Sequence, residues 1–154
     1  MIKIISNSAQ ETMSVGHKLA KCLPNGITIT FNGDLGAGKT TLVRGIAEGL
    51  NIKDVVQSPT FNIMKIYLKG DRPLIHIDAY RLNDCSIDIG LDEYIGYETG
   101  ITVIEWPMFI EKLIPTFHIE ITINRLNDSQ REILINGDEE ILGAIKLWKN
   151  TLFY

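Results

Sequence analysis

The sequence predicts an α/β fold, a three-layer sandwich with a central mixed, largely parallel sheet and an antiparallel hairpin at its edge. Two observations predict this class. A strand-like run leads through a glycine-rich loop into a helical segment, and later apolar runs are paired about turn residues, as in hairpins. With 154 residues, 45% of them hydrophobic, the chain is long enough to bury a core, and no linker or repeat divides it. We therefore expect one domain over residues 1–154.

Capping and turn residues delimit the elements of the first half. Ser8 and Glu11, three residues further on, form a capping box, which predicts a helix over residues 12–23, where apolar side chains recur at helical spacing. The turn residues at 24–26 end this helix. In chain order we expect a strand at 2–5, this helix, a strand at 27–31, a helix at 41–47 and a connecting loop at 55–60.

Turn residues organise the second half into hairpins. The alternating run at 61–68 and the apolar run at 74–78 flank turn residues, which predicts an antiparallel pair. The runs at 117–123 and 132–135 flank a polar turn in the same way. Around these hairpins we expect one or two short helices within 83–100, a buried strand at 101–104, a helix at 109–113 and an amphipathic helix at 138–150.

Residues 33–40 read Gly-Asp-Leu-Gly-Ala-Gly-Lys-Thr, the pattern of a phosphate-binding loop (P-loop). The glycines let the backbone turn its N–H groups toward an anion without a Cβ in the way. Lys39 supplies a cation for the β- and γ-phosphates, and the Thr40 hydroxyl can ligate Mg²⁺. We therefore expect the fold of the P-loop nucleoside triphosphatases. The predicted nucleotide-binding residues of this segment are Gly33, Asp34, Leu35, Gly36, Ala37, Gly38, Lys39, Thr40 and Thr41.

Acidic residues stand at the ends of two predicted strands. Asp78 closes the run at 74–78, and Glu105 follows the run at 101–104. In open α/β sheets the crevice beside the phosphate-binding loop lies at the carboxyl ends of the strands. A triphosphate site needs a carboxylate near Mg²⁺ and a group that orients the attacking water. We expect these two acids to serve the site, rather than to face solvent as ordinary strand-end acids.

Three further residues attract attention through their position. Thr60, in the segment Ser58-Pro59-Thr60, stands where related hydrolases keep a switch threonine that meets the γ-phosphate and Mg²⁺; a plain proline turn is the alternative. Trp106 follows Glu105 at the rim of the crevice, where an indole can stack on a base; a core or surface tryptophan is the alternative. His76 lies inside an apolar strand and is expected to be a hydrogen-bonded core histidine.

Composition and charge limit the partners and the compartment. The net charge of −4, without any basic cluster, argues against a surface that grips a nucleic-acid backbone, so a role in nucleic-acid metabolism is expected to involve a protein partner. No apolar run is long enough to span a membrane, and no signal peptide is recognisable. Cys22 and Cys85 are expected to be reduced thiols of a cytoplasmic protein. Because no Asn-Lys-x-Asp segment is present, adenine is favoured over guanine.

Five motifs together resemble one family, the small TsaE (formerly YjeE) ATPases of bacterial tRNA threonylcarbamoyladenosine biosynthesis. In chain order they are Gly-Asp-Leu-Gly-Ala-Gly-Lys-Thr-Thr at 33–41, Ser-Pro-Thr-Phe at 58–61, His-Ile-Asp-Ala-Tyr-Arg-Leu at 76–82, Gly-Leu-Asp-Glu-Tyr at 90–94 and Ile-Glu-Trp-Pro at 104–107. The resemblance spans residues 5–136. It implies a P-loop ATPase that binds two partner proteins, a catalytic transferase subunit and its paralogue. ATP hydrolysis would reset this pair between rounds of modifying adenosine next to the anticodon, with tRNA contacted only indirectly.

The resemblance also implies roles for individual residues. Lys39 would bind phosphates, and Thr40 and Glu105 would ligate Mg²⁺. Asp78 would position or activate water, although Asp78 and Glu105 could exchange roles. Thr60 would belong to the switch segment. The predicted catalytic residues are therefore Asp78, Lys39 and Thr60, and the predicted metal ligands are Thr40 and Glu105.

Three further side chains, Trp106, Arg131 and Thr12, would approach the nucleotide by the same resemblance.

Two other functions use the same loop. A small nucleotide kinase needs arginine-rich lid and acceptor sites, and the few arginines of this chain are not clustered. A nucleotide-gated assembly module with incidental hydrolysis would need the same residues as the ATPase, so only experiment separates these two.

Overall fold

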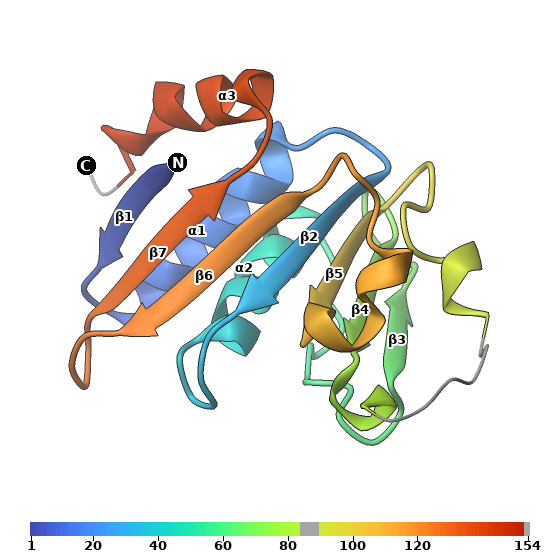
Figure 1. Ribbon diagram of the computed structural model, residues 1–154. Coiled ribbons are helices and arrows are strands. Elements are labelled where there is room, and N and C mark those ends of the chain that lie inside the picture. The colour runs from blue at the N-terminus through green and yellow to red at the C-terminus, as the bar shows by residue number, and fades with distance from the viewer. Residues whose placement is uncertain (84–89, 153–154) are drawn as a thin grey trace.

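The computed structural model describes residues 1–83 and 90–152, whose strands form a seven-stranded sheet in the order β1-β7-β6-β2-β5-β4-β3 (Figure 1). The strands are β1 (Ile2–Ser6), β2 (Ile27–Asn32), β3 (Met64–Tyr67), β4 (Leu74–Asp78), β5 (Ile101–Glu105), β6 (Ile119–Arg125) and β7 (Arg131–Asn136). β2 lies in the middle of this order and leads into the glycine-rich loop. The loop therefore emerges near the centre of the sheet, at the carboxyl end of β2.

The sheet is parallel at its centre and antiparallel on both sides. β2 pairs in parallel with β5 and β6, and β5 pairs in parallel with β4. The pairs β3–β4, β6–β7 and β1–β7 are antiparallel. Both predicted hairpins and the mixed α/β class are confirmed. Because β1 also joins β7, half of the neighbouring pairs among the described strands are antiparallel, a larger share than the sequence predicted.

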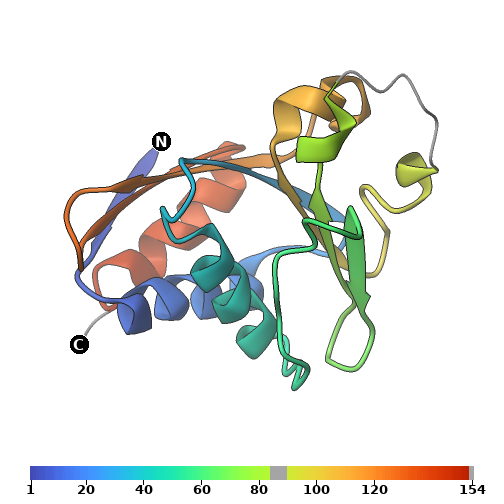
Figure 2. The same cartoon turned by 90° about the horizontal axis from the view of Figure 1, so that it is seen from below.

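Helices cover one face of the sheet, and short 3₁₀ helices cover part of the other (Figure 2). The first set is α1 (Ala9–Cys22), α2 (Lys39–Gly49) and α3 (Glu139–Lys149), and the second is η1 (Tyr80–Leu82), η2 (Leu91–Glu93) and η3 (Pro107–Leu113). β5 contributes to both sides: Val103 joins the apolar cluster beneath the α-helices, and Ile104 joins the cluster beneath the 3₁₀ helices. The predicted three layers are present, and the third is built from these short helices.

Glycines bring α1 and α2 into direct backbone contact. A Cβ on Gly16 would lie 2.3 Å from the carbonyl oxygen of Leu42, and a Cβ on Gly45 would lie 2.1 Å from that of Met13. Real Cβ atoms do not approach backbone oxygens so closely. This contact fixes α2 in the core, and the first turn of α2 carries Lys39.

The predicted capping box is present with one change. The Ser8 hydroxyl accepts a hydrogen bond from the Glu11 backbone N–H at 3.1 Å, so Ser8 caps α1, which begins at Ala9 rather than at residue 12. The Glu11 carboxylate accepts from the backbone N–H of Asn7 at 2.7 Å, one residue before the N–H that the motif predicts. The same end of the helix is therefore stabilised by two side chains.

Three further expectations concern the segment 83–100, the two cysteines and membrane-spanning helices. A short helix within residues 83–100 is confirmed as η2, whereas residues 84–89, and with them Cys85, lie outside the described residues. Cys22 is a free, half-buried cysteine, and burial raises the pKa of its thiol. In the described part of the chain, no helix is both long and apolar enough to cross a membrane.

Candidate functional site

A cavity of about 650 Å³ opens beside the carboxyl ends of β4 and β5 and the glycine-rich loop. Its lining residues are Leu35, Gly36, Gly38, Lys39, Thr40, Thr41, Ser58, Thr60, Asp78, Tyr80, Glu105, Trp106 and Arg131. The volume lies within the usual range for a site that encloses a small molecule. Predicted site residues from segments far apart in sequence thus meet in one cleft.

The loop leaves the beginning of α2 open to the cleft. Gly36 and Gly38 have φ angles of 77° and 113°, which glycine adopts without the strain of a Cβ. Gly38 is the N-cap residue of α2, and no side chain of the described residues caps this end through a hydrogen bond. The amides of the first helical turn have no intrahelical acceptor, and the helix dipole adds partial positive charge. Such an end binds phosphate groups readily.

Lys39 lies inside the cleft, with 8% of its surface exposed. Its Nζ donates a hydrogen bond to the carbonyl oxygen of Gly33 at 2.6 Å and lies 4.9 Å from the ring centroid of Trp106. No carboxylate forms an ion pair with Lys39 among residues 1–83 and 90–152. A largely buried ammonium group that contacts a carbonyl oxygen and an indole ring, and no carboxylate among the described residues, is well placed to bind an anion.

Two carboxylates lie side by side in the same cleft as this cation. Asp78 and Glu105 are direct neighbours in the register of β4 and β5, and only 6% and 4% of their surfaces are exposed. Oδ1 of Asp78 accepts a hydrogen bond from the Tyr80 backbone N–H at 3.0 Å. Oε2 of Glu105 lies 3.0 Å from Nε2 of His76. Burying two such groups together is costly unless a cation or further hydrogen bonds compensate them.

The segment before β3 reaches these carboxylates through two hydroxyl groups. Ser58 Oγ lies 3.4 Å from both Asp78 Oδ2 and Glu105 Oε2, and Thr60 Oγ1 lies 3.3 Å from Asp78 Oδ2. The two hydroxyls are also 3.1 Å from each other. A hydroxyl carries a single proton, so Ser58 cannot donate to both carboxylates at once. The carboxylate pair therefore retains unused acceptor capacity facing the cleft.

Aromatic side chains form one wall of the cleft. The rings of Trp106 and Tyr80 have centroids 5.0 Å apart, and Trp106 stacks on Phe109 at 6.2 Å with an angle of 12° between the ring planes. Trp106 has a φ of 56°, a left-handed conformation that costs a bulky residue about 1–3 kcal/mol. The packing around its ring holds this conformation, so the half-buried indole faces the cleft.

Arg131, at the start of β7, closes the side of the cleft next to the loop. A Cβ on Gly38 would lie 3.7 Å from Arg131 Nε, so the guanidinium group passes directly over the loop. Arg131 Nη1 donates to the carbonyl oxygens of Asn127 and Gln130 at 2.8 and 3.0 Å, which ties the side chain to the β6–β7 turn. A second cation therefore lies beside the P-loop.

The remaining predicted loop residues shape the site without lining it. Gly33 provides the carbonyl that binds Lys39, and a Cβ there would lie 2.5 Å from the carbonyl oxygen of Ile123. The carbonyl of Asp34 accepts a hydrogen bond from the backbone N–H of Ala37 at 3.0 Å, which closes the loop on itself.

Thr12, the remaining residue predicted to approach the nucleotide, is not among the residues that line the cleft. Only 1% of Thr12 is exposed. Its hydroxyl bonds to the Ser6 hydroxyl at 2.8 Å and to the Ser8 carbonyl at 3.2 Å. Thr12 faces the core from the first turn of α1, so it joins the helix to β1 instead.

The cleft contains contacts that the sequence analysis did not assign. The Ser58 hydroxyl lies 3.4 Å from both carboxylates, Tyr80 flanks the indole, and His76, which does not line the cleft itself, contacts Glu105. His76 had a usable signal: it lies two residues before Asp78 on the same strand and therefore on the same face. The partner of His76 was not predictable, because it depends on the register between β4 and β5.

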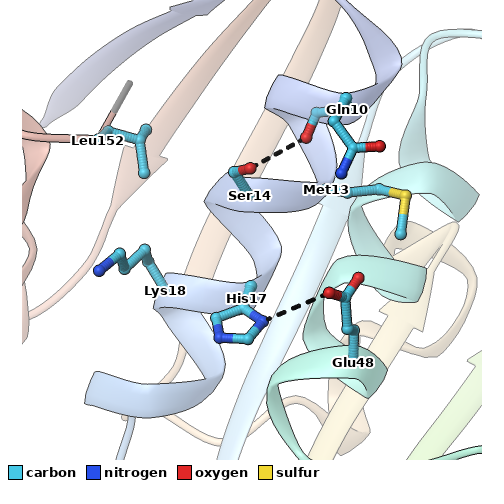
Figure 3. A pocket seen from close by; sticks show the side chains of 7 residues that line it. All are labelled: Gln10, Met13, Ser14, His17, Lys18, Glu48 and Leu152. Atoms are coloured by element: carbon cyan, nitrogen blue, oxygen red, sulfur yellow. Dashed lines mark hydrogen bonds and ion pairs between the residues drawn. The ribbon is translucent and has the colours of Figure 1, made fainter. Parts of the chain in front are cut away.

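A separate, smaller hollow lies between α1 and α2, close to Leu152 (Figure 3). Its polar groups already bond to one another: Ser14 Oγ donates to the Gln10 carbonyl at 3.1 Å, and His17 Nδ1 lies 3.9 Å from Glu48 Oε1. Both side chains of the His17–Glu48 pair are substantially exposed. The hollow therefore has the character of ordinary polar surface, in contrast to the cleft.

Comparison with known proteins identifies the family of this chain. Residues 6–133 match the family model described as "Threonylcarbamoyl adenosine biosynthesis protein TsaE". The chain belongs to the TsaE family. The family resemblance inferred from the five motifs is thereby confirmed.

Individual TsaE proteins resemble the chain over most of its length. The tRNA threonylcarbamoyladenosine biosynthesis protein TsaE of Bacillus subtilis is 45% identical over 124 residues, which cover 80% of this chain and 78% of the relative. The protein of the same name from Treponema pallidum is 37% identical over 136 residues, or 87% and 99% of the two chains. The crystal structure of YdiB from Bacillus subtilis matches with a TM-score of 0.80 and 33% identity, covering 97% of this chain and 95% of that chain.

Proposed function

We propose that this TsaE-family chain serves the formation of threonylcarbamoyladenosine in tRNA as an ATPase that binds and resets partner proteins. Its place in this pathway follows from its family and from the relatives named for it. The ATPase chemistry rests on one observation. An uncapped helix end with Lys39 lies in the same cleft as two adjacent buried carboxylates, Asp78 and Glu105.

The cleft suits Mg²⁺ bound together with phosphate groups. The described residues contain no group of three or more His, Cys, Asp or Glu side chains that could hold a metal ion on their own. Mg²⁺ is commonly held by one or two protein oxygens, waters and substrate phosphates, so such a cage is not required. Thr40 and Glu105 would hold the ion, with Asp78 as the alternative carboxylate. When bound, Mg²⁺ would offset the charge on the β- and γ-phosphates.

The protein groups divide the work of hydrolysis. The loop amides and Lys39 Nζ would bind the phosphates. Lys39 Nζ would then donate to a phosphate oxygen in place of the Gly33 carbonyl oxygen. Asp78 Oδ2 would accept a proton or a hydrogen bond from the attacking water. Thr60 lies 3.3 Å from that oxygen and would help to orient the water or the γ-phosphate. Trp106 and Arg131 would flank the nucleotide and exclude solvent.

Protein partners fit this chain better than a direct grip on tRNA. The net charge is −4, and a direct grip would need many phosphate contacts from lysine and arginine. The partners we propose are the transferase subunit of the pathway and its paralogue, which would hold the tRNA. Nucleotide hydrolysis would change the affinity of the chain for that pair and so release it for the next round.

Counting rounds of modification tests this function. The chain is mixed with the two partners and the other components of the reaction, and modified adenosine and released phosphate are measured per partner complex. Wild type is expected to support many rounds. Asp78→Asn should support about one round, and Asp54→Asn, which alters an exposed aspartate outside the cleft, should match wild type. If Asp78→Asn hydrolyses no ATP yet sustains many rounds, the chain is a nucleotide-gated assembly module.

A further inference from the structure

We propose that His76 is a positioning residue for Glu105, the carboxylate assigned above to Mg²⁺. The inference rests on the proposed function, because it assumes that Glu105 serves the metal. His76 does not line the cleft and is fully buried on β4. It would therefore act through Glu105 and not by touching the nucleotide.

The contact between the two residues is short and buried. His76 Nε2 lies 3.0 Å from Glu105 Oε2, and the two side chains are 0% and 5% exposed. His76 and Glu105 project from neighbouring parallel strands toward the same face, since His76 pairs with Val103 in the register, two residues before Glu105. The imidazole thus reaches the carboxylate from deeper in the core and limits its rotation.

The other ring nitrogen indicates which tautomer makes this contact. His76 Nδ1 is buried and has no hydrogen-bond partner within residues 1–83 and 90–152. With the proton on Nε2, the ring donates to the carboxylate and leaves only a lone pair unpaired. A proton on Nδ1 alone would leave a buried N–H without an acceptor and would place two acceptors 3.0 Å apart. The contact is therefore a donation from Nε2–H to Glu105.

This donation assigns different tasks to the two carboxylate oxygens. Oε2 receives the His76 donor and the 3.4 Å contact from Ser58. Within the described part of the chain, Oε1 forms no hydrogen bond or ion pair of its own, so it is the oxygen left for a metal ion. Removing a group that orients a ligating side chain in this way typically lowers metal affinity or activity by about 10- to 100-fold.

A pair of amide substitutions tests the role. The amide nitrogen of glutamine can take the place of Nε2, whereas that of asparagine is too close to the backbone to reach it. The affinity for fluorescent ADP is measured in a buffer that contains Mg²⁺ and in one that contains EDTA. We call the ratio of the affinity with Mg²⁺ to the affinity with EDTA the Mg²⁺ effect. His76→Asn should reduce this ratio by about 10-fold or more, while His76→Gln should retain most of it. Binding in EDTA should change by less than about twofold in both variants. His17→Asn, at a partly exposed histidine on α1 outside the cleft, is the matched control.

Epistasis with Glu105 completes the test. In a Glu105→Ala background, His76→Asn should not reduce the Mg²⁺ effect further, because the carboxylate that His76 positions is already absent. Equal losses with Mg²⁺ and with EDTA, equal behaviour of the Gln and Asn variants, or additivity with Glu105→Ala would each overturn the inference and leave His76 a core residue. If His76→Asn does not fold, His76→Gln is measured alone and together with Glu105→Ala. A Mg²⁺ effect in His76→Gln as small as that of Glu105→Ala would overturn the inference.

The test separates this inference from the function beneath it. If wild type binds no ADP in either buffer, the proposed function fails and the role of His76 fails with it. If wild type binds ADP more tightly with Mg²⁺, and His76→Asn does so to the same degree, the function stands and only the inference is overturned.

Discussion

Replacing Gly45 with alanine should destabilise the protein and weaken nucleotide binding together. The added Cβ would lie 2.1 Å from the Met13 carbonyl oxygen, more than 1 Å short of the 3.4 Å at which ordinary contact begins. The Cβ is fixed rigidly to the backbone of α2 and its neighbour is a backbone oxygen, so no side-chain rotation relieves the overlap. α1 and α2 must separate, and α2 carries the first-turn amides and Lys39 of the cleft.

The size of the effect follows from two opposing terms. Alanine in a helix interior is more favourable than glycine by about 1 kcal/mol. Overpacking in a core costs about 1–3 kcal/mol, and an overlap of a Cβ with a backbone oxygen that cannot rotate away belongs at the upper end of this range. The net loss is therefore about 2 kcal/mol, which corresponds to a fall in Tm of roughly 4–8 °C for a domain of this size.

Thermal and urea unfolding followed by circular dichroism measure this effect, with Gly143→Ala as the matched control. Gly143 lies in α3, and a Cβ there would meet nothing within 4 Å, so alanine should raise the stability by about 0.5–1 kcal/mol. Equal or greater stability of Gly45→Ala relative to wild type would refute the reasoning about the helix contact. A destabilised Gly45→Ala that binds ADP normally would refute the link between this contact and the cleft.

Three further predictions concern the cleft itself. Lys39→Ala removes a charge-assisted phosphate contact worth about 1.5–3 kcal/mol, so calorimetry should show ADP affinity reduced by at least about 10-fold, and an unchanged affinity would exclude the site. Glu105→Ala should weaken ADP binding more with Mg²⁺ than with EDTA; an equal loss would count against its role as a ligand. In a Trp148→Phe background, the fluorescence of Trp106 should change on addition of ADP, because the indole lines the cleft. A silent titration with ADP bound would place the nucleotide away from the indole.

Local chemistry explains which features could be predicted from the sequence. The P-loop depends on glycines at fixed spacing, the hairpins depend on their turn residues, and both lie in contiguous segments. Asp78 and Glu105 were predictable as strand-end acids because consecutive strands of such sheets tend to end at one crevice. Their arrangement as direct neighbours depends on β4 pairing with β5, which is a long-range choice.

Features that depend on tertiary packing were predicted poorly or not at all. β1 pairs with β7 across almost the entire chain, and nothing within either strand specifies this partner. The burial of Thr12 was not predictable, because a motif at the start of a helix does not reveal which way its hydroxyl points. The position of Ser58 beside both carboxylates and the left-handed backbone of Trp106 both arise from contacts between distant segments.

A crystal structure with Mg²⁺ and a non-hydrolysable ATP analogue tests the central claim most directly. We expect the β- and γ-phosphates to lie within the loop, with Lys39 Nζ transferred from the Gly33 carbonyl to phosphate oxygen. We also expect Thr40 and one of the two carboxylates to hold Mg²⁺. An analogue bound elsewhere, with Lys39 still 2.6 Å from Gly33, would contradict the account.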